Sequence, residues 1–227
     1  MNKKRLFNSL SLIINLSIIY FTIDATLYNF RSDIIRNELV YGFDGIKSYC
    51  FFTVLSNTFL ALSCIVSLVY NIKNAVKDEY IFPKKVFALK FVATVSVTVT
   101  MMTVILFLAP YAQISGTGYF SLFTANNFYL HFLSPLLAVI TFIFFEKTEE
   151  FDFKNTYSGL IPTALYSMVY ITMVAIIGEA NGGWIDFYGL TFGGHLWLTP
   201  ISAIAMLGAT YLFSFSLYKL NKKFNKI

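Results

Sequence analysis

Two apolar stretches of this 227-residue chain each carry a stripe of residues at steps of three and four that includes polar side chains. The first stripe comprises Thr53, Asn57, Leu60, Cys64 and Ser67, and the second comprises Asn127, His131, Ser134, Ala138 and Thr141. Residues at this spacing share one face of a helix. A threonine hydroxyl becomes a useful nucleophile when a nearby histidine takes its proton. Thr53 and His131 are therefore a candidate catalytic pair.

Such a pair needs two further groups. One must orient the imidazole ring, and another must donate a hydrogen bond to the charge that develops on a carbonyl oxygen. Asp24, Glu179, an asparagine, or a carbonyl freed by Pro135 are candidates for the first role. Asn57 and Asn127 are candidates for the second. In a membrane, the natural reaction class is cleavage of an ester in a substrate that bears an acyl chain.

The composition indicates that these helices lie in a membrane. Hydrophobic residues make up 57% of the chain and charged residues only 13%, and the mean hydropathy is +0.66. These values exceed those of ordinary soluble domains. The net charge of +5 reflects membrane topology rather than nucleic-acid binding, because most charges lie between the apolar runs. Partners are therefore expected to be membrane lipids or an acyl-ester substrate.

The apolar runs predict one transmembrane domain spanning residues 1–227, an all-α bundle of six helices. The expected spans are about 6–28, 48–72, 86–109, 120–145, 157–178 and 195–220. The first run is longer than the apolar part of a signal peptide. Residues 95–100 alternate as a strand would, but a run of more than twenty apolar residues favours a helix. Pro110 is expected to end the third helix, and a short surface helix is expected near 34–39.

The positions of the basic residues predict the orientation. Fourteen of the 17 lysines and arginines fall on one side of the six-span topology. Because basic loops stay in the cytoplasm, both termini are expected there. The residue usage, rich in Lys, Asn, Ile and Phe, is typical of an AT-rich bacterial genome, so the expected membrane is a bacterial plasma membrane. Thr53, Asn57 and His131 would then lie in the outer half of the bilayer, with His131 about 15 Å deep by helical rise.

Other functions have weaker support in the residues. A catalytic zinc usually takes three protein ligands, and the chain has two distant histidines without an HExxH pair. A metal is therefore not expected. No glycine-rich phosphate loop is present in the sequence, and no other cofactor is expected either. Threonine and asparagine also serve structural roles in membrane helices. A non-catalytic binder or transporter of lipids or small amphiphiles, and a lipid acyltransferase, therefore remain alternatives.

Several short motifs resemble one family. Phe51-Phe-Thr53-x-x-Ser-Asn57, Leu130-His131-Phe-x-x-Pro135 and Leu108-Ala-Pro110 are similar to those of the androgen-induced-gene membrane proteins, especially their bacterial branch. Eukaryotic members hydrolyse fatty acid esters of hydroxy fatty acids with an intramembrane threonine and histidine. The resemblance implies that Thr53 is the nucleophile and His131 the base. The residues around Thr53 depart from the eukaryotic pattern, so the substrate does not transfer.

Overall fold

A computed structural model describes residues 3–30, 45–77 and 79–225, and the regular elements in these ranges are helices. Six helices are long and apolar enough to cross a membrane: Lys4–Tyr28, Phe52–Lys77, Lys84–Ile114, Ala125–Phe145, Phe153–Ile177 and Leu196–Phe224. The chain is therefore an all-α integral membrane protein, as its sequence predicts. The surface helix expected near 34–39 lies outside the described residues.

Several spans combine α-helical segments with short segments of other helical geometry. In chain order, the elements of the spans are α1 (Lys3–Phe30), α2 (Phe52–Lys77), α3 (Lys84–Thr103), η3 (Val104–Leu108), α4 (Ala109–Ile114), α5 (Ala125–Phe128), η5 (Tyr129–Leu133), α6 (Ser134–Phe145), η6 (Phe153–Leu160), α7 (Ile161–Ile171), η7 (Thr172–Ile177), η9 (Leu196–Leu198) and α8 (Thr199–Phe224). Short 3-10 helices η2 (Gly45–Cys50), η4 (Tyr119–Phe123) and η8 (Glu179–Asn181) lie in the connections.

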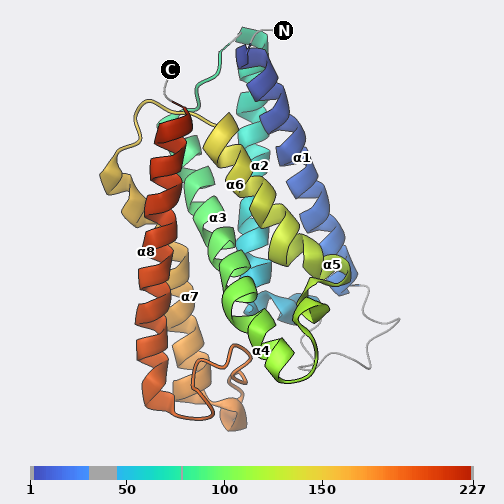
Figure 1. Cartoon of the computed structure of the whole chain (residues 1–227), viewed down its shortest axis with the longest axis vertical. Coiled ribbons are helices and arrows are strands. Elements are labelled where there is room, and N and C mark those ends of the chain that lie inside the picture. The colour runs from blue at the N-terminus through green and yellow to red at the C-terminus, as the bar shows by residue number, and fades with distance from the viewer. Residues whose placement is uncertain (1–2, 31–44, 78, 226–227) are drawn as a thin grey trace.

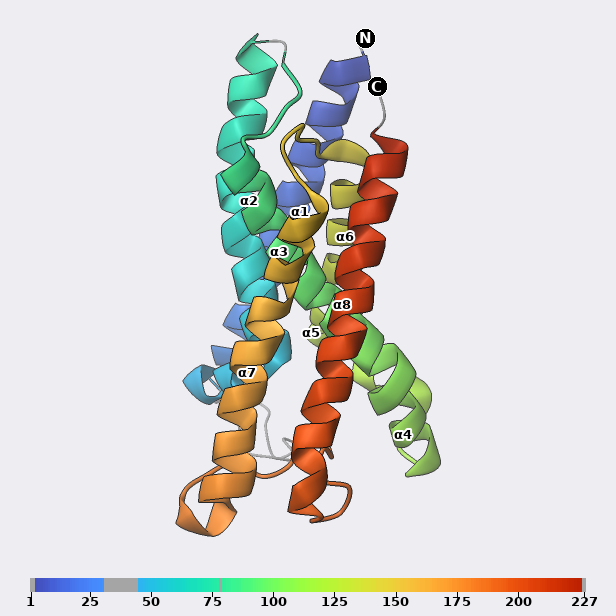
Figure 2. The same ribbon diagram turned by 90° about the vertical axis from the view of Figure 1, so that its left-hand side faces the viewer.

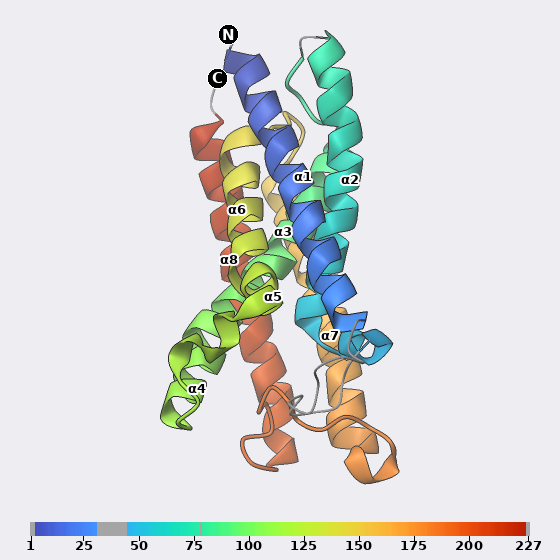
Figure 3. The ribbon, with the colours of Figure 1, turned by 90° about the vertical axis from the view of Figure 1, so that its right-hand side faces the viewer.

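The first helix begins, and the last helix ends, at the same end of the bundle (Figure 1). We call this the terminal end and the other the opposite end. Figure 3 shows α1 and α2 side by side, in agreement with their extensive packing. Figure 2 shows α7 beside α8, with α4 leaning away from both at the opposite end. An even number of spans places both termini at one end.

The central helix is α3, which packs against α2, α6 and α8. Phe91, Ala93, Val95 and Val97 are completely buried in it. Because α3 is enclosed on every side, its sequence has no polar face and no helical period to detect. This explains how residues 95–100 can alternate like a strand and still be helical. Hydroxyls within this stretch bond to carbonyls one turn back, which satisfies them inside an apolar bundle.

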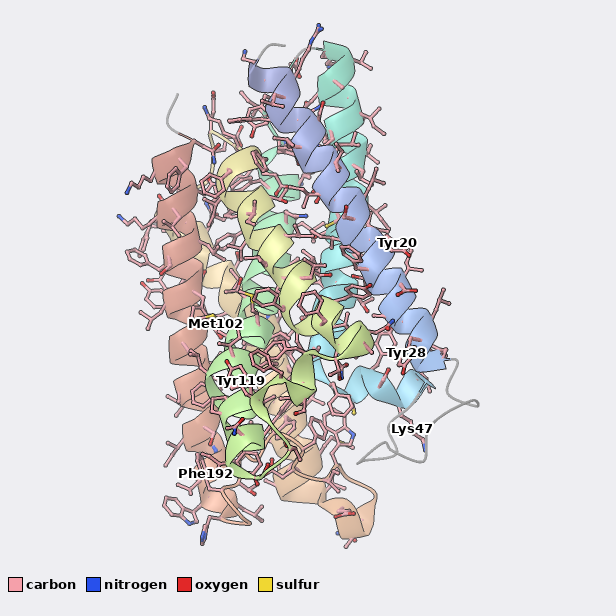
Figure 4. All side chains as sticks on the ribbon, turned by 45° about the vertical axis from the view of Figure 1, so that its right-hand side comes forward. Tyr20, Tyr28, Lys47, Met102, Tyr119 and Phe192 are labelled. Atoms are coloured by element: carbon pink, nitrogen blue, oxygen red, sulfur yellow. The ribbon has the colours of Figure 1, made fainter. Side chains whose placement is uncertain are left out.

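The third span continues through Pro110 to Ile114, so the prediction that it ends at 109 was wrong. The turn η3 is a π-helix, and the Ala109 N–H bonds the Val104 carbonyl five residues back. In that register the ring nitrogen of Pro110 leaves the Ile105 carbonyl without its donor. The Tyr119 hydroxyl donates to this carbonyl at 3.1 Å (Figure 4). A side chain from the following segment thus replaces the missing backbone donor.

The fourth span uses the same arrangement around Pro135. The turn η5 is also a π-helix, in which the Ser134 N–H bonds the Tyr129 carbonyl. Pro135 leaves the Leu130 carbonyl free, and the Asn57 Nδ2 of α2 donates to it at 3.0 Å. The freed carbonyl expected near His131 is therefore present but already bonded.

The other span limits differ from the predicted ones by a few residues. The fourth span begins at Ala125 rather than 120, because the residues before it form the separate helix η4. The second and sixth spans run to Lys77 and Phe224, beyond their apolar runs. Buried asparagines in these extensions, such as Asn74 and Asn221, bond to backbone carbonyls of neighbouring segments. Polar contacts therefore prolong the helices where hydropathy falls.

Candidate functional site

Thr53 lies in the first turn of α2, partly buried beneath the loop that precedes η9. The hydroxyl of Tyr188 in that loop accepts the Phe52 N–H at 3.0 Å and lies within hydrogen-bonding reach of the Thr53 side chain. Burial raises the pKa of Tyr188 to about 12, despite bonds to its oxygen that lower it. The phenol is therefore neutral at physiological pH. The Phe52 N–H is the group that donates to the Tyr188 hydroxyl, and the Thr53 side chain lies near that hydroxyl.

A partly buried aspartate fixes the loop that carries Tyr188. Asp186 accepts hydrogen bonds from the Tyr170 hydroxyl at 2.7 Å, the Leu190 N–H at 2.9 Å and the Thr191 N–H at 2.7 Å. Partial burial by itself raises the pKa of Asp186, but these bonds to the carboxylate outweigh it and the net pKa is lowered. The loop is thus held to α7 through an ionised carboxylate.

His131 lies in the π-helical turn η5, and its ring is held by one carbonyl. Nδ1 of His131 lies 2.7 Å from the Leu122 carbonyl oxygen in η4. A carbonyl can only accept, so Nδ1 carries the hydrogen, and in a neutral imidazole Nε2 then carries the lone pair. The group that orients His131 is therefore the Leu122 carbonyl, and none of the groups expected from the sequence.

Asn57 joins the turn of Thr53 to the turn of His131. Its Nδ2 donates to the Thr53 carbonyl at 2.8 Å and to the Leu130 carbonyl at 3.0 Å. These bonds place the backbone of Thr53 on one side of the carboxamide and the backbone of Leu130, the residue before His131, on the other. Within the described residues, the Thr53 hydroxyl and the His131 ring form no direct hydrogen bond. Both hydrogens of the Asn57 amide are used, so Asn57 has none left for an oxyanion.

The other predicted site residues lie apart from this pair. Asp24 accepts a hydrogen bond from Asn126 Nδ2 at 3.3 Å, whereas Asn127 and Glu179 are exposed. The extra residue in the π-helical turn explains why Asn127 is exposed. An inward stripe counted back from Ser134 at α-helical spacing reaches Asn127, but the wider turn moves the inward position to Asn126. Asn127 therefore faces away from the stripe in which the sequence placed it.

A second polar cluster, which the sequence did not predict, lies near the terminal end. We call it the Lys90 cluster; it comprises Lys90, Glu146, Asn15, Ser11, Cys64, Asn71 and Asn8, all buried. Lys90 Nζ donates to Asn15 Oδ1 and, at 2.8 Å, to Cys64 Sγ, and lies 3.8 Å from Glu146 Oε1. Asn71 Nδ2 donates to Asn8 Oδ1 at 2.9 Å. The cluster ties α1, α2 and α3 to the end of α6.

The Lys90–Glu146 ion pair is almost completely buried, with 1% and 2% of the side-chain surfaces exposed. At 3.8 Å and an effective dielectric constant of about 20, the attraction is about 4 kcal/mol. Removing each ion from water costs several kcal/mol. Because these energies nearly cancel, the surrounding hydrogen bonds decide the charge state. Burial raises the pKa of Glu146 more than Lys90 and the bonds from Asn15 and Ser11 lower it.

The cluster was missed because both ions lie near ends of apolar runs. Lys90 counted as a basic residue of the cytoplasmic side, and Glu146 as the start of a charged loop. The sequence does hold a signal: Asn8, Ser11 and Asn15 form a polar stripe in the first apolar run, which a lipid-facing helix would not carry.

An apolar layer separates the two polar regions. It comprises Ile18, Leu60, Ala93, Val97 and Ala138, all completely buried. On α2, Leu60 lies between Asn57 and Cys64; on α3, Ala93 and Val97 follow Lys90. The Thr53–His131 region and the Lys90 cluster are therefore distinct sites at different depths.

Among the described residues, no three side chains of His, Cys, Asp or Glu come together as a metal site would require. Burial also raises the pKa of the Cys50 thiol, close to Thr53, to about 11, so this thiol is no rival nucleophile at neutral pH.

The chain matches no protein-family model, no curated protein and no solved structure. The basis for assigning its function is therefore the geometry of its own residues.

Proposed function

We propose that this chain is an intramembrane hydrolase of fatty acyl esters, with Thr53 as nucleophile and His131 as general base. The observation that carries the proposal is the hydrogen bond from His131 Nδ1 to the Leu122 carbonyl. It leaves the lone pair on Nε2, the state that a general base requires. Asn57 holds the two turns together. The motif resemblance to the androgen-induced-gene proteins supports the same pair.

In the proposed reaction, Thr53 Oγ1 attacks the ester carbonyl carbon while its proton passes to His131 Nε2. The bond to the alcohol oxygen then breaks, and the alcohol takes that proton as it leaves. Water, deprotonated by Nε2, then attacks the acyl-threonine ester; the bond from the acyl carbon to Oγ1 breaks, Oγ1 takes the proton back from Nε2, and the fatty acid is released. For the first step the Thr53 side chain must turn from Tyr188 towards His131. A change of one χ1 rotamer is the smallest motion of this kind.

The direct test is labelling of the purified, membrane-reconstituted protein with a fluorophosphonate probe, which traps activated hydroxyl nucleophiles. We expect labelling of the wild type and none of Thr53→Val or His131→Gln. Thr58→Val is the matched control, because Thr58 lies in the same helix and its buried hydroxyl has no hydrogen-bond partner in the described part of the chain. Equal labelling of all four proteins, or no labelling together with no hydrolysis of a panel of acyl esters, contradicts the proposal.

One observation favours a second candidate, a non-catalytic binder of a lipid or amphiphile. The Thr53 hydroxyl lies beside Tyr188 and is not hydrogen-bonded to His131, which is compatible with a ligand contact. Extraction of the purified protein tests this. A single lipid species retained by the wild type and lost in Thr53→Val, without acyl transfer to residue 53, favours the binder. Transfer of the acyl group to an added alcohol instead of water would identify an acyltransferase.

We also infer that both termini are cytoplasmic, in a bacterial plasma membrane. The basic residues of the sequence gather on the side of the terminal end, and loops of this kind are retained in the cytoplasm. The Thr53–His131 region would then lie towards the outer leaflet. Reporter fusions that are active on one side of the membrane only, attached to each terminus, test this orientation.

A further inference from the structure

We propose that the Lys90 cluster is a proton-binding site, in which Glu146 Oε2 takes up the proton from the aqueous phase at the terminal end. This site is separate from the Thr53–His131 region and does not depend on the reaction proposed there. Its ligand is the proton. Its effect is to change the charge that holds α3 to the end of α6.

The two oxygens of Glu146 have very different surroundings. Oε1 accepts hydrogen bonds from Asn15 Nδ2 at 3.3 Å and Ser11 Oγ at 3.5 Å, and lies 3.8 Å from Lys90 Nζ. Oε2 is buried and has no hydrogen-bond partner among the described residues. A carboxylate oxygen without a donor is poorly stabilised in an apolar interior. Oε2 is therefore the carboxylate oxygen at which a proton binds most readily, because no hydrogen-bond donor has to be displaced from it.

The lysine remains well solvated by protein groups when Glu146 is neutral. Lys90 Nζ keeps Asn15 Oδ1 and Cys64 Sγ as acceptors, so it does not depend on Glu146 alone. Uptake of one proton forms an O–H bond at Oε2 and changes the charge of the cluster from zero to +1. No other covalent bond changes. The attraction between Lys90 and Glu146 is then lost, and the link from α3 to the end of α6 weakens.

Few other titratable groups face Glu146. Cys64 of α2 lies on the far side of Lys90, and Tyr80 precedes α3, where burial and the charge of Glu146 raise the pKa of its phenol. The side chains of α1 that reach Glu146 are the neutral Asn15 and Ser11. From α8, Asn221 Nδ2 donates to the backbone carbonyl of Glu146 at 2.9 Å. The raised pKa of Glu146 itself agrees with a proton-binding role.

The path from Glu146 to the aqueous phase is short at the terminal end only. Glu146 directly follows the last residue of α6, and the next residue, Lys147, is partly exposed at the terminal end. In the other direction lie Ile18, Leu60, Ala93, Val97 and Ala138 of the apolar layer, none of which can carry a proton. The proton therefore exchanges with the compartment at the terminal end.

Infrared spectroscopy of the full-length protein in lipid vesicles tests the proposal. We would subtract the spectrum of Glu146→Gln from that of the wild type at a series of pH values. The expected result is a protonated-carboxyl C=O band at pH values above the usual glutamate pKa. The band should shift in D₂O and disappear as the pH rises. Glu179→Gln, which alters an exposed carboxyl at the opposite end, is the matched control and should retain the band.

A second variant tests the role of Lys90. In Lys90→Met the carboxyl loses its cation, so the same band should persist to a higher pH than in the wild type. Circular dichroism would establish that the variants keep their helices. The proposal is overturned if the difference spectrum of the folded wild type and Glu146→Gln shows no such band above about pH 5. That result would mean that Glu146 is permanently ionised and that the pair has a structural role only.

Discussion

Replacing Asn57 with leucine tests whether one carboxamide fastens the turn of Thr53 to that of His131. The change removes two donated bonds, of 2.8 Å and 3.0 Å. Hydrogen bonds between membrane helices contribute about 0.6 kcal/mol on average. The Leu130 carbonyl is the costlier loss, because Pro135 has no N–H to offer it and an unsatisfied buried group costs about 1–3 kcal/mol. Loss of Asn57 Oδ1, buried without a partner, offsets part of this.

We therefore expect Asn57→Leu to destabilise the protein by about 2 kcal/mol, a fall in Tm of about 4–8 °C for a chain of this size. Thermal unfolding in detergent, followed by circular dichroism, measures it. Thr58→Val, which removes an unpartnered hydroxyl from the same helix, should change Tm little. Pro135→Ala supplies the missing N–H, so the double variant should lose less stability than Asn57→Leu alone. If Pro135→Ala gives no rescue, the assignment of the Leu130 carbonyl is wrong.

Three further predictions concern other contacts. At a pH at which Glu146 of the variant is ionised, Lys90→Met should destabilise by about 3–5 kcal/mol, because it leaves that carboxylate buried and unpaired, whereas Lys90→Met with Glu146→Leu should recover most of that loss in the same thermal assay. Folding lowers the pKa of Asp186 from its usual value of 3.8. The stability that its ionised carboxylate gives the loop is therefore present above pH 3.8 and is lost as the pH falls through the lower folded pKa. Proteolysis of the loop should become faster in acid for the wild type, whereas Asp186→Asn should already be cleaved faster than the wild type near neutral pH and should change little in acid. A Cβ at Gly159 would lie 2.7 Å from Ser214 Oγ, so Gly159→Ala should lower Tm, and Ser214→Ala should restore part of it; no difference between the single and double variants would contradict this contact.

The sequence was sufficient for the fold because hydropathy over twenty residues is a strong signal in a membrane protein. It was less informative about the details of each span. Proline normally ends or kinks a helix, and nothing near Pro110 indicates that a π-helical turn and a distant hydroxyl, Tyr119, allow the helix to continue. The same kind of turn moved the inward position from Asn127 to Asn126.

Of the candidate site, the sequence supplied the residues but not their partners. The stripe of α2 is buried at Asn57, Leu60 and Cys64, as its spacing predicts. The group that orients His131 is a backbone carbonyl, and any residue in the position of Leu122 provides one. Sequence patterns cannot identify such a partner. Glu146 was missed for a similar reason, since its burial depends on segments that only the fold brings over it.

The apolar layer has a consequence for how the molecule responds to a transmembrane voltage. Polar groups at both depths polarise, whereas the layer of Ile18, Leu60, Ala93, Val97 and Ala138 does not. The ions of the Lys90 cluster lie on the terminal side of this layer. A proton that reaches Glu146 from the terminal end is therefore expected to cross a smaller part of the membrane voltage than a proton that reaches it from the opposite end.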